Sequence, residues 1–396
     1  MDIMDKKKLL KLGTALYLLA SVLSFGALKV LGLGPTTDQI ISPTVITPAG
    51  SKFKIDPSIP RDQTCPLNGD KFTKMEKDTW ATRRPLAVMI ENHMDSRPQS
   101  GLSHSDVVYE AVAEGGITRF LALFYCQAAA EDVELGPIRS ARTYFIDFAS
   151  EYGDKPLYVH VGGANSPGPA NALGQLDDYD WVGVNDINQF SVGFPTFWRD
   201  YDRLGHEVAT EHTMYSTTEK LWAYVGKNRE LTNVDKKGVA WDTKFIPYEF
   251  KDDAKVETRP ETASLGFIFW KGYSDYAVQW NYDKKTNSYL RLNANQPHMD
   301  KDNNTQLSAK NVVVLFMAEQ NANDGYENNV HLLYKDKGTG SAKVYQDGKK
   351  ISATWQKKDR ISRLKLIDSN TGGEVKLNRG RIWFEVLPSG TKVNES

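Results

Sequence analysis

The succession of a strand, a helix and a second strand between residues 117 and 161 constrains the fold of this chain most. Ile117–Tyr125 is a mostly apolar run of β-forming residues, as expected for a strand covered on both faces. Apolar spacing predicts a helix over Pro137–Tyr152, with Pro137 at its first position and Gly153 as its cap. Leu157–Val161 is a further short apolar strand. This order predicts a right-handed βαβ crossover.

Around this unit the sequence predicts an α/β domain followed by a β-rich domain. Strand-like runs at Leu86–Glu91 and Asp106–Ala113 belong to the first domain, residues 65–228, which we expect to contain a mixed sheet. Beyond residue 228, short apolar segments alternate with Asn, Asp, Gly and Lys turns, and Asp347–Gly348 is a hairpin signal. We therefore expect an α+β chain with a β-rich C-terminal domain at 229–390 and a tail at 391–396.

The N-terminus has the pattern of a membrane segment. Lysines precede an apolar run of about 25 residues, which is long enough to cross a hydrocarbon core of about 30 Å. The positive charge before this run predicts that residues 1–33 form a cytoplasmic tip and a single-pass signal-anchor helix, with the body outside the cytoplasm. A cleaved signal peptide is the alternative. Residues 34–64, rich in Pro, Thr and Ser, are predicted to form an extended linker.

An extracytoplasmic location bears on the two cysteines, Cys65 and Cys126. Outside the membrane a disulfide between them can form and persist, and two unpaired thiols are the alternative. The formal net charge of −1 gives no global field that favours nucleic acid, so partners must be sought at local sites. We expect no nucleic-acid partner, and the cytoplasmic membrane is the expected partner of the N-terminal helix.

Arg139 and Arg142 stand in the run Gly136–Arg142, at the start of the predicted helix. Cations at this end oppose the helix dipole, at a cost of about 0.3–1 kcal/mol each. Two arginines placed beside unpaired N–H groups favour a bound anion. The alternative is that they form structural salt bridges with carboxylates of the chain, namely Glu110, Glu114 or Asp147.

Other residues are expected at the same place, because ligands of open α/β sheets bind beyond the carboxyl ends of parallel strands. Asn92 follows the strand at Leu86–Glu91, and Gly162 and Gly163 follow the strand that ends at Val161. The glycines lack a Walker lysine and a three-glycine fingerprint, and the histidines lack a metal-site spacing, so we expect no nucleotide, cofactor or metal. The predicted ligand-binding residues are Asn92, Arg97, Arg119, Arg139, Arg142, Gly162 and Gly163.

Charged residues in the apolar segment 109–120 are the candidates for catalysis. Glu110, Glu114 and Arg119 need partners there, because lone buried charges are costly. One interpretation is a buried Glu–Arg network, and the other is a carboxylate that acts as acid, base or metal ligand. His160, inside an apolar strand, is a further catalytic candidate, although a satisfied core histidine is the more common arrangement.

His298 and Asp300 are the candidates in the second domain, where they follow the strand-like segment Tyr289–Leu292. A His–Asp pair two residues apart suits acid–base or metal chemistry. A solvated turn is the simpler interpretation of the same pattern.

Five motifs in order resemble the YerB-like family of bacterial envelope lipoproteins. They are Arg84–Asn92 (RPLAVMIEN), Arg97–Leu102 (RPQSGL), Asp106–Glu110 (DVVYE), Glu114–Phe120 (EGGITRF) and Gly136–Arg142 (GPIRSAR). The resemblance covers residues 65–388 and implies an extracytoplasmic, membrane-tethered protein of two domains. It brings no biochemical activity that can be transferred. Because this chain lacks the lipoprotein cysteine, we expect a transmembrane helix in place of the lipid.

The leading hypothesis is therefore a membrane-anchored envelope protein that binds an anionic cell-wall or envelope ligand through Arg119, Arg139 and Arg142. A first alternative is a hydrolase or transferase that acts on an envelope polymer, with Glu110 or Glu114 as acid, base or metal ligand. A second alternative is a structural scaffold whose second domain docks other envelope proteins. The sequence leaves open whether the chain is an enzyme.

Overall fold

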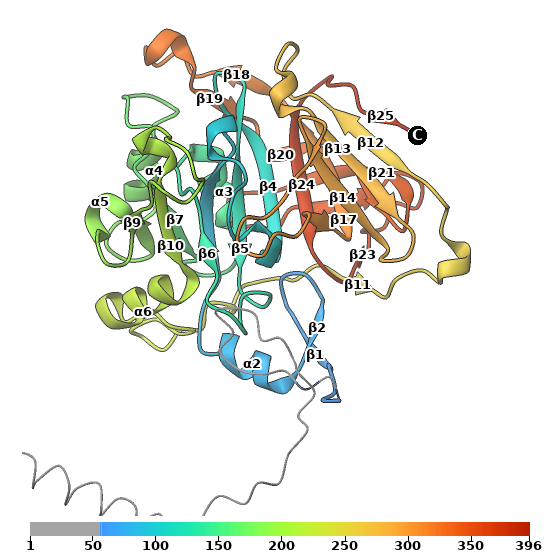
Figure 1. The fold of residues 1–396 in the computed structure, drawn as a ribbon, viewed down its shortest axis with the longest axis horizontal. Coiled ribbons are helices and arrows are strands. Elements are labelled where there is room, and N and C mark those ends of the chain that lie inside the picture. The colour runs from blue at the N-terminus through green and yellow to red at the C-terminus, as the bar shows by residue number, and fades with distance from the viewer. Residues whose placement is uncertain (1–55, 57) are drawn as a thin grey trace, which may run out of the picture. The chain divides into compact units, whose positions relative to one another are not determined.

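The computed structural model describes residue 56 and residues 58–396, which are drawn in colour in Figure 1. The predicted membrane helix at 1–33 and most of the predicted linker lie outside the described residues. Within them, no helix combines the length and the apolar character that a membrane crossing needs. The described chain consists mostly of strands with few helices, which confirms the predicted α+β class, mixed sheet and β-rich C-terminal region.

A mixed ten-stranded sheet, in the order β22-β21-β20-β17-β24-β4-β5-β3-β7-β8, runs through both halves of the chain (Figure 1). The first half supplies β3 (Leu86–Glu91), β4 (Val107–Glu114), β5 (Ile117–Phe124), β7 (Leu157–His160) and β8 (Asp186–Asn188). The second half supplies β17 (Asn311–Met317), β20 (Gly338–Gln346), β21 (Lys349–Lys357), β22 (Lys365–Asp368) and β24 (Ile382–Pro388). The halves meet where β24 pairs in parallel with β4, with Glu385 opposite Glu110.

The strand directions show that the predicted βαβ crossover is wrong. β5 pairs antiparallel with β3, and β3 pairs in parallel with β7, so β5 and β7 run in opposite directions with β3 between them. The reason is a tight hairpin between β4 and β5, in which Glu114 lies opposite Ile117. Gly115 and Gly116 form its turn with positive φ values of 55° and 81°, which side chains disfavour. A glycine pair between two apolar runs is the hairpin signal in this sequence.

A second sheet has the order β15-β14-β13-β12-β25, and β16 also pairs with β14. Its strands are β12 (Ser264–Phe267), β13 (Val278–Asp283), β14 (Ser288–Asn293), β15 (Gln296–Pro297), β16 (Ser308–Ala309) and β25 (Asn394–Glu395). It packs on the central sheet through large buried side chains. The ring of Trp280 on β13 meets that of Trp383 on β24 edge to face, with centroids 5.2 Å apart. Arg291 on β14 is fully buried against the same two rings.

Helices and short strands complete the described chain. The α-helices are α2 (Lys74–Trp80), α3 (Thr143–Ala149), α4 (Ala172–Asp178), α5 (Gln189–Val192) and α6 (Thr218–Arg229). The short strands are β1 (Gln63–Thr64), β2 (Lys71–Phe72), β6 (Glu134–Leu135), β9 (Trp198–Arg199), β10 (Met214–Thr217), β11 (Phe250–Lys251), β18 (Glu319–Asn321), β19 (Leu332–Tyr334) and β23 (Leu377–Asn378). The predicted hairpin at Asp347–Gly348 is confirmed, since it joins β20 to β21 with Gln346 opposite Lys349.

Candidate functional site

Strands β3, β4, β7 and β8 end at one edge of the central sheet, where β5 begins, and we call this the carboxyl edge. The run Gly136–Arg142 lies along it as extended chain. Its backbone N–H groups find partners on β3 and on the segment after β7: Arg139 donates to the Met89 carbonyl and Ala141 to the Gly162 carbonyl, each at 2.9 Å. The predicted helix start is therefore wrong, and α3 begins only at Thr143, with Arg142 as its N-cap residue.

Glu114 occupies the position between Arg119 and Arg142 where a bound anion was expected. It accepts hydrogen bonds from Nη2 of both arginines, at 2.9 Å from Arg119. The two guanidinium groups are almost fully buried, with side-chain exposures of 2% and 7%. Burial alone would raise the pKa of the Glu114 carboxyl, but the two arginine charges hold it well below its usual range. The arginine pair is thus opposed by a carboxylate of the chain, and Glu114 is poorly suited to acid–base chemistry.

Arg139 has a different carboxylate partner, Glu91 at the end of β3. Arg139 Nε lies 3.0 Å from Glu91 Oε1, and the other Glu91 oxygen lies 2.8 Å from Nδ1 of His212. The Arg139 side chain is one quarter exposed, so it faces solvent more than Arg119 or Arg142 does. Neither Glu91 nor His212 stood among the predicted partners, because both lie far from Arg139 in the chain.

Glu110 belongs to a buried network between the two sheets. It is fully buried, accepts a hydrogen bond from Thr118 Oγ1 at 2.7 Å and forms an ion pair with Arg291 on β14. Glu385 lies opposite it on β24, where burial, followed by the negative charge of Glu110, raises the pKa of Glu385 well above its usual range. Arg291 therefore lies beside two fully buried carboxylates, Glu110 and Glu385. This geometry supports the buried-network interpretation of Glu110 and leaves a substrate no access to it.

Asn92 and Arg97 connect the carboxyl edge to the second sheet. The Asn92 amide donates to Thr118 Oγ1 at 2.7 Å, and its carbonyl oxygen accepts hydrogen bonds from Arg97 and Asn293. Arg97 also donates to the Asp275 carbonyl, and burial lowers the pKa of its guanidinium to about 10. Both residues thus have partners within the chain, and these partners come from both halves of it.

His160 and the two predicted glycines lie together at the ends of β7 and β8. His160 is fully buried, with one ring nitrogen 2.5 Å from Asp186 and the other 2.6 Å from the Gly162 carbonyl oxygen. Both nitrogens are therefore engaged by the chain, as in a core histidine. Gly162 has a positive φ of 59°, and its amide donates to the Asn188 side chain. Gly163 forms a bridge with Ala141.

His298 and Asp300 are buried, which excludes the solvated turn that their spacing suggested. His298 lies between Arg291 and Gln99, at 2.5 and 2.7 Å from them, and burial followed by neighbouring arginine charges lowers its pKa well below the usual range. Asp300 accepts hydrogen bonds from the backbone N–H groups of Gly101 and Ser103. Both residues therefore fasten the second sheet to the loop after β3.

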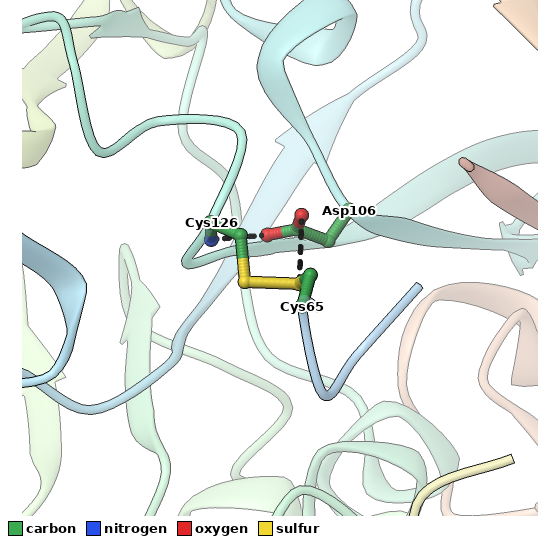
Figure 2. A group of neighbouring side chains, drawn as sticks. All are labelled: Cys65, Asp106 and Cys126. Carbon is green, nitrogen blue, oxygen red and sulfur yellow. Dashed lines mark hydrogen bonds between the residues drawn. A yellow bond between two sulfur atoms is a disulfide. The ribbon is translucent and has the colours of Figure 1, made fainter. Parts of the chain in front are cut away.

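Cys65 and Cys126 form a disulfide, with their Cα atoms 6.0 Å apart (Figure 2). Asp106 lies against this bridge and accepts hydrogen bonds from the backbone N–H groups of Tyr125 and Cys126. Burial raises the pKa of Asp106 to about 7, although these N–H donors act in the opposite direction. Because the two sulfur atoms are bonded to each other, the group offers no thiolate to a metal ion.

A pocket of about 780 Å³ lies where β20 begins and β21 ends, and none of the predicted ligand-binding residues lines it. Its lining contains a buried ion pair, with Lys357 Nζ 2.8 Å from Glu151 Oε1. It also contains Arg363, which pairs with Glu374 outside the pocket. Three further lysines are exposed, and their ammonium groups form no ion pair or hydrogen bond within the described residues. We call this the basic pocket and define it by these lysines, Lys244, Lys358 and Lys365.

The basic pocket was only partly recognisable from the sequence. Residues 357–365 contain five cations in nine positions, namely Lys357, Lys358, Arg360, Arg363 and Lys365. Such a cluster is normally a solvated surface, so it did not suggest a cavity. The decisive contributions come from Lys244 and Ile246, more than one hundred residues earlier in the chain.

Comparison with known proteins identifies matching domains in both halves. The family model described as "Protein of unknown function (DUF3048) N-terminal domain" matches residues 72–232, and the corresponding C-terminal domain matches residues 268–384. The "Putative lipoprotein YerB" of Bacillus subtilis (strain 168) is 28% identical over 335 residues, which cover 84% of this chain and 88% of that protein.

A solved structure shows the same fold. The crystal structure of the YerB protein from Bacillus subtilis matches with a TM-score of 0.65 and 24% sequence identity. The match covers 84% of this chain and 99% of that one. At this level of identity the likeness shows the fold and carries no site residue across.

Proposed function

Because this chain belongs to the YerB-like (DUF3048) family, we propose that it is an envelope-associated protein that binds an anionic ligand in the basic pocket. The name of the Bacillus subtilis relative describes a lipoprotein, a class held at a membrane by lipid. In this chain the apolar segment within residues 1–33 takes that role, with the body outside the cytoplasm. The ligand is an anion, as predicted from the sequence, but its proposed site is the basic pocket and not the arginines at the carboxyl edge.

The observation that carries the proposal is the excess of unpaired positive charge in the basic pocket. Lys244, Lys358 and Lys365 form no ion pair within the described residues, and Asp359, the carboxylate beside Lys358 in the lining, offsets only part of their charge, whereas Arg119 and Arg142 are already opposed by Glu114. An anion at the lysines gains attraction without displacing an existing ion pair. An anion at the arginines would have to compete with a carboxylate that is already buried there.

The apolar part of the lining indicates the kind of anion. Ile246 and Ile361 both border the pocket, and each residue is more than half exposed to solvent. Isolated exposed isoleucines are ordinary, but two beside a cavity give a ligand apolar surface to cover. We infer a ligand with a phosphate or carboxylate group joined to an apolar or sugar-like portion, as in cell-wall polymers and their precursors.

Titration of the purified full chain with poly(glycerol phosphate) tests this proposal. The pocket variant K244E/K358E/K365E should bind at least about tenfold more weakly than the wild type, because three attractions become repulsions. The control variant K271E/K349E/K392E makes the same charge change at exposed lysines outside the pocket, and we expect binding within about threefold of wild type. Equal losses in both variants, or no binding by the wild type, would refute the proposal.

A further inference from the structure

A group of imidazole and carboxylate side chains lies at the carboxyl edge, separate from the basic pocket. Potential metal-ligand atoms of His93, Asp95 and His212 all lie within 4.8 Å of one another. His93 and Asp95 belong to the short turn that follows β3, and His212 ends another short turn before β10. We call these three residues the histidine cluster. This cluster could not be recognised from the sequence, because 117 positions separate Asp95 from His212.

The Glu91 carboxylate contacts the His212 ring and holds its orientation. Its Oε2 atom lies 2.8 Å from Nδ1 of His212, and Arg139 holds its other oxygen at 3.0 Å. A histidine that ligates a metal usually donates its second ring N–H to a carboxylate in this way. Donation from Nδ1 leaves the lone pair of His212 on Nε2, and that atom has no hydrogen-bond partner within the described part of the chain.

His93 and Asp95 present their ligand atoms to the same space. The Asp95 backbone N–H donates to Nδ1 of His93 at 3.2 Å, so this nitrogen carries a lone pair, and it lies 3.6 Å from Asp95 Oδ2. The His93 ring stacks on the His212 ring with centroids 4.7 Å apart and planes 14° from parallel. A shared ion therefore requires the partly exposed His93 ring to turn out of this stack and its Nδ1 atom to release the Asp95 N–H, because one lone pair cannot both accept a hydrogen bond and ligate a metal.

From this geometry we propose that His93, Asp95 and His212 bind a divalent transition-metal ion, with Glu91 as the positioning residue. Two imidazoles and one carboxylate form a ligand set that suits Zn²⁺ and Fe²⁺ and leaves coordination positions open. His212 is buried and supplies a fixed ligand, whereas Asp95 is exposed, so an ion can enter from solvent. The nearby exposed Glu211 adds negative charge that favours a cation.

Calorimetric titration of the tag-free, EDTA-treated full chain with Zn²⁺ tests this site. We expect one saturable site in the wild type and at least about tenfold weaker binding in H93A/H212A. D95A replaces a side chain that is 64% exposed, so we expect it to weaken binding without changing the melting temperature measured in EDTA. H206A, at an exposed histidine outside the cluster, is the control and should bind like the wild type.

The role of Glu91 is tested with Co²⁺, whose visible absorption reports its ligands. We expect E91Q to shift this spectrum and to weaken binding by about tenfold, neither of which a purely structural Glu91 would cause. The absence of saturable Zn²⁺ binding by the wild type would overturn the site. Zn²⁺ binding that persists unchanged in both H93A/H212A and D95A would overturn it as well.

Discussion

At the level of single residues, Glu114 stabilises the carboxyl edge, because it forms ion pairs with both Arg119 and Arg142. Glu114→Ala leaves two buried guanidinium groups without a carboxylate. We expect it to lower the free energy of unfolding by about 3–5 kcal/mol in urea titrations. Glu257→Ala, at an exposed carboxylate, is the control and should change it by less than about 0.5 kcal/mol. Equally small effects of both substitutions would contradict this account.

Asp336 makes the free energy of unfolding depend on pH. Burial, followed by the charge of Asp147, raises the pKa of Asp336 from 3.8 to about 7. The folded chain therefore keeps a proton that the unfolded chain releases, and this group makes stability fall as the pH rises from about 4 to about 7.

Asp336→Asn removes that titration, because an amide releases no proton. Between about pH 5 and pH 8, the free energy of unfolding of the variant should fall less than that of the wild type, by up to about 3 kcal/mol. Urea titrations at the two pH values measure this difference. The same pH dependence in both proteins would show that Asp336 does not retain its proton in the folded state.

At the element scale, the disulfide ties the segment before α2 to the end of β5. Its cysteines are 61 positions apart, and in the chain-entropy account a bridge over such a loop stabilises by about 4 kcal/mol. We expect C65S/C126S to lower the free energy of unfolding by about 2–5 kcal/mol. A reducing agent should destabilise the wild type and leave the variant unchanged. Equal stability of variant and wild type without reductant would contradict the prediction.

Elements with a strong local pattern were predictable from the sequence. β3 has the bounds that its apolar run predicted, because a strand buried on both faces leaves continuous apolar sequence. The extended run Gly136–Arg142 was not predictable, because its hydrogen-bond partners, Met89 and Gly162, come from other parts of the chain. Its apolar spacing resembled a helix, and tertiary hydrogen bonds overrode that local preference.

The candidate sites were predictable only in part, for a related reason. A carboxylate in an apolar segment requires a partner, so the Glu114–Arg142 pair was among the predicted interactions. The sequence does not reveal which partner will be used when it is distant. Glu110 pairs with Arg291, 181 positions away, and the basic pocket joins Lys244 to residues beyond 350.

At the scale of the whole molecule, the ten-stranded sheet makes the two halves depend on each other. β4 and β24 pair across the halves, and Arg291 on β14 forms an ion pair with Glu110 on β4. We therefore expect one calorimetric unfolding transition, with equal calorimetric and van't Hoff enthalpies. Two resolved transitions would show that the halves unfold independently. In that case Arg291→Met would lower the midpoint temperature of only the later transition.

Hydrogen exchange in the presence and absence of poly(glycerol phosphate) is the sharpest test of whether an anionic ligand occupies the basic pocket. We predict slower amide exchange in residues 356–365 and around residue 244, with little change in residues 136–142. Protection confined to residues 136–142 and to the start of β5 would place the ligand at Arg119, Arg139 and Arg142 instead. That result would refute binding in the basic pocket.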